Sequence, residues 1–227
     1  NKNTVLGADY NLLFKNFNFY GEVSRSANGG MAQIHGALIS LDPSVALSIV
    51  YRDYQRDFQN NLSNAFAESS KNINEKGVMI GLKLSKGKKL TLNAYLDQFK
   101  FPWLKYLVDK PNTYGHDYYR YNITYKVSES FTLRNRIELV DYKRGMAQKE
   151  QGYLVYQDII YKPLSNSFSF SFRYALFETD SYNSRVYAYE NDVLYYFSIP
   201  AYYRSGSRTY LSIKYQVRKG IDVWFRW

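Results

Sequence analysis

Cysteine is absent from this 227-residue chain, which excludes a disulfide framework and any metal site built on thiolates. Histidine is nearly as rare, because His35 and His116 are the only two in the sequence and lie in different segments. Two separated histidines do not provide the ligand spacing of a zinc site, so we predict no metal site and ordinary polar roles for both. The sequence also contains no run of roughly 18 apolar residues, the length that a membrane-spanning helix requires.

Catalytic motifs are missing as well. The sequence contains no Gly-x-Ser-x-Gly elbow and no glycine-rich phosphate loop, since "ANGG" is typical of a turn. A barrel enzyme centred on His35 with Ser48 or Asp42 is conceivable, but nothing else in the sequence supports such a centre. We therefore predict a non-enzymatic protein with no catalytic residues and no cofactor.

Aromatic and basic residues are abundant instead. The chain contains 25 Tyr and 14 Phe, yet its mean hydropathy is only −0.47. Lys and Arg number 30 against 20 Asp and Glu, which gives a formal charge of +10. A basic balance suits nucleic acid, an anionic lipid surface or an anionic solute, and the charge alone does not choose among them.

Apolar and polar residues alternate along most of the chain, which is typical of β-strands. In "FSFSFRYAL", for example, Phe168, Phe170 and Phe172 share one face, whereas Ser171 and Arg173 share the other. Patterns of helical period are nearly absent, and the short connections predict antiparallel pairing. The alternation predicts about thirteen strands. They lie at roughly 4–14, 18–26, 31–41, 45–54, 77–86, 89–100, 117–127, 130–141, 152–162, 167–177, 193–200, 207–217 and 220–227.

Strand length and loop length together predict a transmembrane β-barrel. The strands are about ten residues long, the length that a tilted strand needs to cross a bilayer. Tight turns alternate with longer loops, as in outer-membrane barrels, and Tyr and Trp gather near strand ends in "FPWLKY", "DYYRY" and "PAYYR", as an interfacial aromatic girdle requires. We predict an all-β fold, an antiparallel transmembrane β-barrel. It would form a single domain over residues 1–227 in the bacterial outer membrane, with the lipid bilayer as a partner.

A soluble all-β carbohydrate-binding protein is the alternative. Strands of a soluble sandwich also alternate, but their polar face points to bulk water and their apolar face fills one core. In a barrel of the outer membrane the apolar face points to lipid and the polar face lines the lumen. Detergent-dependent solubility separates the two interpretations.

The chain ends "IDVWFRW", in which Ile221, Val223, Phe225 and Trp227 share one strand face. A last strand that ends on an aromatic residue resembles the C-terminal signal of outer-membrane barrels, whose last strand runs toward the periplasm. Counting back from a thirteenth strand places Asn1 on the outer side, whereas bacterial barrels usually have an even number of strands with both termini inside. We therefore expect at least one strand or a domain ahead of Asn1, and about fourteen or more strands in the full protein.

The C-terminal fifty residues carry a closer resemblance, most clearly in "SRVYAYENDVLYYFSIPAYY" and "SIKYQVRKGIDVWFRW". They resemble outer-membrane β-barrel proteins of Bacteroidota whose precursors carry a periplasmic helix-hairpin-helix domain ahead of the barrel. This resemblance implies a DNA-uptake-related protein as a further alternative. No helix-hairpin-helix segment occurs in the sequence, so no DNA-related role passes to these residues, and no direct nucleic-acid site is visible in them.

The polar strand faces carry charged residues that a barrel would turn toward its lumen. They include Arg52, Lys83, Arg120, Arg134, Arg136, Glu138, Arg173, Lys214 and Arg226. The set indicates either an anion-favouring or ligand-binding lumen, or an ion-pair network that fills a closed barrel. Neither interpretation needs a catalytic role.

Aromatic residues in the predicted exposed loops are candidate partner contacts. Trp103, Tyr106 and Tyr114 could grip a glycan or another protein, although a loop cap packed on itself explains them equally well. "IPAYYRSGS" is a second such loop. We predict a channel, a transport component or a barrel subunit of a larger outer-membrane complex, with other outer-membrane proteins, a small solute or a glycan as partners.

Overall fold

The computed structural model describes residues 3–60, 65–69, 71–104, 107–111, 114–144, 149–164 and 167–227. Twelve long strands form one sheet in which each strand pairs with the next long strand of the chain. They are β1 (Val5–Phe14), β2 (Phe17–Ser26), β3 (Met31–Asp42), β4 (Val45–Tyr54), β5 (Glu75–Lys86), β6 (Leu90–Lys100), β9 (Tyr114–Lys126), β10 (Phe131–Arg144), β11 (Glu150–Tyr161), β12 (Phe168–Thr179), β15 (Ser205–Arg218) and β16 (Ile221–Arg226). Two small ribbons lie outside this sheet, β7 (Trp103–Leu104) with β8 (Leu107–Pro111) and β13 (Val186–Tyr187) with β14 (Ala201–Tyr202).

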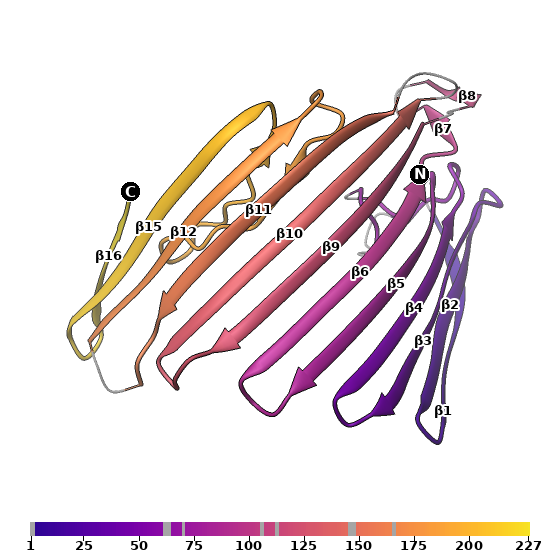
Figure 1. The fold of residues 1–227 in the computed structure, drawn as a ribbon. Coiled ribbons are helices and arrows are strands. Elements are labelled where there is room, and N and C mark those ends of the chain that lie inside the picture. Colours follow the sequence, from indigo (N-terminus) through magenta and orange to yellow (C-terminus); the bar gives the residue numbers. More distant parts are fainter. Residues whose placement is uncertain are drawn as a thin grey trace. The chain divides into compact units, whose positions relative to one another are not determined.

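The up-and-down strand order follows from the connections. Short turns such as 15–16, 43–44 and 219–220 join antiparallel neighbours, and longer connections such as 55–74 and 180–204 alternate with them (Figure 1). The prediction of an all-β antiparallel fold is confirmed. None of the described residues belongs to a helix that could span a membrane.

The chain divides into two compact units. The first unit consists of Asn1–Leu82, Tyr95–Tyr118 and Tyr142–Lys149, and the second of Lys83–Ala94, Tyr119–Asp141 and Glu150–Trp227. Each unit has its own buried charges and its own long connection, 55–74 in the first and 180–204 in the second.

The strands of the second unit bury charge on one face and expose apolar side chains on the other. Glu138, Asp158 and Arg173 are buried, whereas their strand neighbours Ile137 and Tyr174 are 43% and 47% exposed. A soluble domain would do the opposite, because exposed apolar surface costs free energy in water. The face with Ile137 and Tyr174 therefore suits lipid, and the charged face is the one that lines the lumen of a barrel.

The first unit has the same inverted pattern. Arg52 and Glu75 are almost completely buried, whereas Leu6 and Leu12 are 76% and 62% exposed. Burying an arginine and exposing leucines is favourable only where the outer surroundings are apolar. The soluble carbohydrate-binding alternative is therefore disfavoured by both units.

The C-terminal strand keeps its pattern to the last residue. The backbone of Trp227 exchanges two hydrogen bonds with Leu211 in β15, at 3.0 and 2.9 Å. Val223, Phe225 and Trp227 are exposed on the apolar face, and Arg226 lies on the charged face opposite Ser212. The aromatic ending is thus a paired part of the sheet.

One predicted strand is wrong. Residues 193–200 belong to the connection between β12 and β15, and within this range only Ser198 takes part in a β-bridge, with Glu190. Val193–Phe197 are consecutive apolar residues that do not alternate, and Pro200 has no N–H to donate to a ladder. The sheet has twelve long strands rather than thirteen, so the argument from an odd strand count no longer applies.

Candidate functional site

The connection 180–204 folds back over the charged face of the second unit, and we call it the arm. Arg136 in β10 donates a hydrogen bond to the Tyr187 carbonyl oxygen at 3.1 Å, and Arg173 in β12 donates to that of Tyr189 at 2.8 Å. At Gly152 in β11, an added Cβ would collide with the Ser184 carbonyl oxygen. The close approach of arm and strand therefore requires a glycine at this position.

Glu190 is the main anchor of the arm. Its side chain is fully buried and accepts hydrogen bonds from the Tyr202 hydroxyl at 2.6 Å, from the Arg208 guanidinium at 2.6 and 3.2 Å, and from Arg226. Arg226 also pairs with Asp192. The arm is thereby bound to β15 and to the last strand, β16.

The protonation of this anchor is set by opposing effects. Burial raises the pKa of Glu190, but hydrogen bonds from Arg208 and Tyr202 and the positive charges of Arg208 and Arg226 outweigh it, so the pKa lies below its usual value. Burial raises the pKa of Tyr202, and its hydrogen bond to Glu190 adds to the effect. Glu190 is therefore ionised and Tyr202 neutral over the physiological range.

The wall under the arm repeats one arrangement, a buried carboxylate between two arginines. Glu138 accepts two hydrogen bonds from Arg120, at 2.9 and 2.6 Å, and one from Arg136. Asp158 accepts two from Arg173, at 2.6 and 2.8 Å, and Arg134 lies 4.0 Å away.

Both carboxylates are fully buried. Removing one partner of such a pair typically costs about 3–5 kcal/mol, because the other charge is left buried and unpaired. These pairs fix the wall and present rigid donors to the arm.

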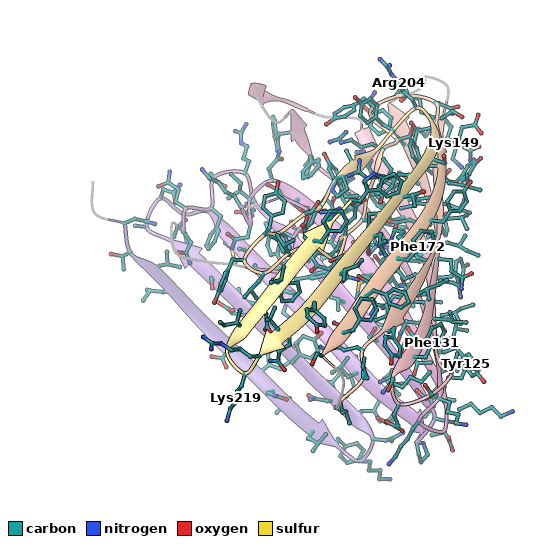
Figure 2. The ribbon with its side chains drawn as sticks, turned by 90° about the vertical axis from the view of Figure 1, so that its left-hand side faces the viewer. Tyr125, Phe131, Lys149, Phe172, Arg204 and Lys219 are labelled. Carbon is teal, nitrogen blue, oxygen red and sulfur yellow. The ribbon has the colours of Figure 1, made fainter. Side chains whose placement is uncertain are left out.

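The exposed fractions of these arginines differ. The Arg173 side chain is 2% exposed, whereas that of Arg134 is 40% exposed. Arg204 and Lys219 flank β15 at its opposite ends (Figure 2). Lys214 forms a partly exposed ion pair with Asp222 at 2.7 Å, and Lys83 is exposed.

The first unit has a separate buried cluster. Arg52 donates to Glu75 at 2.6 Å and to both oxygens of Asp97 at 2.8 and 3.2 Å, and its guanidinium lies 5.1 Å from the Phe66 ring centre. An added Cβ at Gly77 would lie 2.8 Å from the guanidinium carbon of Arg52, so only glycine leaves room for this side chain. The cluster ties connection 55–74 to its wall.

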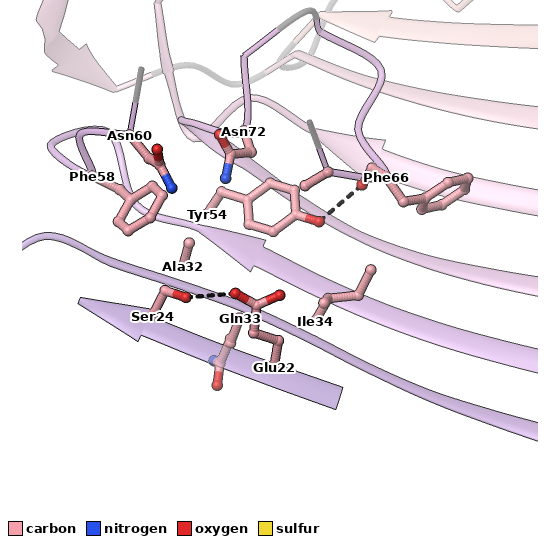
Figure 3. A pocket seen from close by; sticks show the side chains of 11 residues that line it. Glu22, Ser24, Ala32, Gln33, Ile34, Tyr54, Phe58, Asn60, Phe66 and Asn72 are labelled. Atoms are coloured by element: carbon pink, nitrogen blue, oxygen red, sulfur yellow. Dashed lines mark hydrogen bonds between the residues drawn. The ribbon is translucent and has the colours of Figure 1, made fainter. Parts of the chain in front are cut away.

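A cavity of about 340 Å³ in the first unit (Figure 3) is lined in part by Phe66, whose ring also contacts Arg52. Its lining includes Glu22, Ser24, Ala32, Ile34, Tyr54, Phe58, Asn60, Phe66 and Asn72. The Tyr54 hydroxyl donates to the Phe66 carbonyl oxygen at 2.9 Å, and the Ser24 hydroxyl donates to Glu22 at 2.8 Å. Most of the rings around this cavity are occupied in packing, because Tyr54 and Phe58 are 2% exposed.

The loop aromatics predicted as partner contacts are not brought together in the described part of the chain. Trp103 exchanges hydrogen bonds with the Asn74 side chain at 2.9 and 2.8 Å, and the Arg56 guanidinium lies 4.0 Å from its ring centre. Trp103 is thus packed within its own unit. Tyr106 and the side chain of Tyr114 lie outside the described residues.

The two histidines occupy unrelated places. The His35 ring bonds Tyr10 at 3.0 Å and Gln33 at 3.3 Å, and His116 stacks on aromatic rings such as Phe99 at 5.4 Å. The hydrogen bonds of Ser48 and Asp42 go to Gly81 and Ser44. A His35 catalytic centre therefore has no support in the described contacts.

The sequence analysis did not identify several carboxylates that bind the buried arginines. Glu190 and Asp192 fall in a predicted loop, and Glu75 precedes its predicted strand. The signal that could have found Glu190 is the alternation of "SRVYAYE", where Ser184, Val186 and Glu190 are buried and Tyr187 is exposed. That pattern indicates a segment that packs against the rest of the protein on one side and is exposed on the other.

Comparisons with known proteins give the fold. No family model matches the chain, and no curated protein matches it either. Three solved structures of OmpT, an outer membrane protein of Vibrio cholerae, are similar over 97% of this chain. The in-vitro folded form has a TM-score of 0.59 and 13% identity, its trimer form 0.56 and 12%, and the outer-membrane expressed form 0.55 and 13%.

The chain spans 64% of the length of each of these structures. At such low identity the likeness concerns the fold alone. The resemblance to Bacteroidota proteins with a helix-hairpin-helix domain stays a prediction. The fold of this chain is that of a transmembrane outer-membrane β-barrel, as predicted, and it supports a place in the lipid bilayer of a bacterial outer membrane.

Proposed function

We propose that this chain forms a non-enzymatic solute channel or transport component of the bacterial outer membrane. The observation that carries the proposal is the arm, which is bound to the charged wall by one side and exposes the other. Tyr195 and Phe197 in the arm are 98% and 74% exposed. A lumen that is lined by such a segment, and not packed solid with side chains, leaves space for solute.

The charges of the second unit favour anions. Among the described contacts of this unit, arginine–carboxylate pairs involve six arginines against four carboxylates. These are Arg120, Arg134, Arg136, Arg173, Arg208 and Arg226 against Glu138, Asp158, Glu190 and Asp192. An excess of fixed positive charge along a lumen raises the local concentration of anions.

Conductance in planar lipid bilayers tests the proposal. We expect discrete ion currents and, under a KCl gradient, a reversal potential that indicates anion preference. Protein that runs as a folded, heat-modifiable band but carries no current would contradict the channel and favour a barrel subunit of a larger complex. A cation preference would contradict only the anion-favouring lumen.

A thiol-labelling experiment tests the position of the arm. Because the chain has no cysteine, Tyr195→Cys would be its only thiol, and a bulky water-soluble methanethiosulfonate reagent should reduce the current. Val223→Cys is the matched control, since it lies on the apolar face and its modification should leave the current unchanged. Equal effects at both positions would mean that the arm does not border the solute path.

A further inference from the structure

The arm is a two-sided ribbon. On the side against the wall, Ser184, Val186, Ala188 and Glu190 are all at most 1% exposed. The β13–β14 pairing and the bridge between Glu190 and Ser198 hold its two halves together. By strand alternation, Tyr187 and Tyr189 lie on the opposite side, and both are exposed.

The open side of this ribbon is aromatic along its length. Tyr182 and Tyr203 pack edge to face at 5.2 Å between ring centres, and Tyr189 and Phe197 lie 5.5 Å apart. The Arg185 guanidinium lies 4.2 Å from the Tyr182 ring centre and 5.3 Å from that of Tyr187, so it links the Tyr182–Tyr203 pair to Tyr187. We call this surface the aromatic track and define it by these residues.

The tip of the arm extends the exposed aromatic surface. Tyr195 and Tyr196 are 98% and 65% exposed. The backbone of Tyr195 is in the left-handed region at φ 66°, which side chains other than glycine rarely adopt. The arm lies on the charged side of the sheet, away from the lipid-facing side. An exposed aromatic surface of this extent on such a segment indicates a contact surface for a ligand.

We propose that the aromatic track binds a neutral oligosaccharide chain. A sugar ring has an apolar C–H face edged by hydroxyl groups, which matches a tyrosine ring with its polar tip. The arm carboxylates Glu190 and Asp192 are turned to the wall and paired with arginine. The open side therefore offers rings and phenol hydroxyls, together with the Arg185 donors other than the two that bond the Tyr187 hydroxyl and the Tyr182 carbonyl oxygen.

A nucleic acid strand suits the track less well. Its binding depends on several Lys or Arg contacts to phosphates in addition to stacked rings. Residues 180–204 contain only two basic residues, Arg185 and Arg204, against Asp180, Glu190 and Asp192. The charge balance of the arm thus favours a neutral chain.

The inference rests on the proposed channel function and adds a neutral solute to the small anions that the arginines favour, but its test needs no conductance. Binding is measured by saturation-transfer NMR and calorimetry on the full chain in detergent micelles. The probes are linear hexasaccharides of α-1,4-glucan, β-1,4-glucan, β-1,4-mannan and β-1,4-xylan, with a single-stranded oligonucleotide for comparison.

We expect at least one hexasaccharide to bind, with saturation transfer from tyrosine rings. Tyr189→Ala and Phe197→Ala should each weaken binding by about fivefold or more, the scale of one lost stacking contact. Tyr174→Ala, on the lipid-facing side of β12, is the matched control and should bind normally. Heat-modifiable mobility verifies that each variant is folded.

Binding of no hexasaccharide, or binding that survives both arm substitutions in folded protein, would overturn the inference. Tighter binding of the oligonucleotide than of every hexasaccharide would overturn it as well. Sugar binding without conductance would count against the channel alone, whereas conductance without sugar binding would count against the track alone.

Discussion

Replacing Glu190 with alanine should release the arm while leaving the sheet folded. The substitution removes the acceptor of the buried Tyr202 hydroxyl and the carboxylate partner of Arg208 and Arg226. No strand of the wall loses a ladder hydrogen bond, because Glu190 lies in the arm. The cost should therefore fall on docking of the arm and not on global stability.

The size of the effect follows from the exposure of each partner. A hydrogen bond to a charged group contributes about 1.5–3 kcal/mol, and that estimate fits the buried Tyr202 hydroxyl. Arg208 is 46% exposed and Arg226 is 19% exposed, so solvent screening reduces each of their contributions to about 0–1 kcal/mol. The sum of about 1.5–5 kcal/mol corresponds to a roughly 10- to 4,000-fold rise in the open population of the arm.

Limited trypsin digestion of detergent-solubilised protein measures this population, since cleavage of the arm after Arg185, next to the fully buried Val186, requires the arm to leave the wall. Glu178→Ala is the matched control, because Glu178 is exposed on the outer face and its side chain accepts a hydrogen bond from the Tyr153 hydroxyl in β11 at 3.1 Å. A cleavage rate of Glu190→Ala within twofold of the wild type would refute the reasoning. If this variant fails to fold, Glu190→Gln keeps the side-chain shape and the acceptor for Tyr202 and tests the loss of charge alone.

Four further predictions test the same account. Because the pKa of Glu190 is lowered in the folded protein, its contribution is present above the unfolded value near 4.5 and lost as pH falls through the lower folded value, so arm cleavage should rise only in acid below about pH 4.5. Gly152→Ala should increase arm cleavage at neutral pH, because the new methyl group collides with the arm backbone. Ile137→Lys, on the lipid-facing side of β10, should cost about 2–4 kcal/mol if it lies near the bilayer midplane, which chemical refolding into vesicles would measure. Arg134→Ala should reduce anion preference with little loss of stability, whereas Arg173→Ala should destabilise the folded barrel by about 3–5 kcal/mol in the same refolding assay.

The strands were predictable because each has two physically different faces. In β12, Phe170 and Phe172 alternate with Ser171 and Arg173, and the structure places the two sets on opposite faces. Alternation reports only that one side differs from the other. It does not say whether the segment is a barrel strand with one side toward lipid and the other toward the lumen, or a segment inside the barrel with one side packed on the wall and the other toward the lumen.

The arm was misjudged for that reason. "SRVYAYE" alternates as a strand would, yet its buried side lies against other strands and its exposed side carries tyrosines. The prediction places residues 193–200 in a strand, although Val193–Phe197 are consecutive apolar residues that do not alternate. Their exposure is possible where a segment presents aromatic side chains to a ligand or to a lumen.

The arginine partners of Glu190 could not have been found from the sequence, because they lie on strands distant from the arm. Glu190 takes one arginine from β15 and one from β16, and neither spacing marks an ion pair. The register of β16 in the structure explains the position of Arg226 in the sequence. It must alternate with Phe225 and Trp227, which face outward. The last strand therefore performs two tasks at once, with aromatic residues on the lipid side and a single arginine that holds the arm inside.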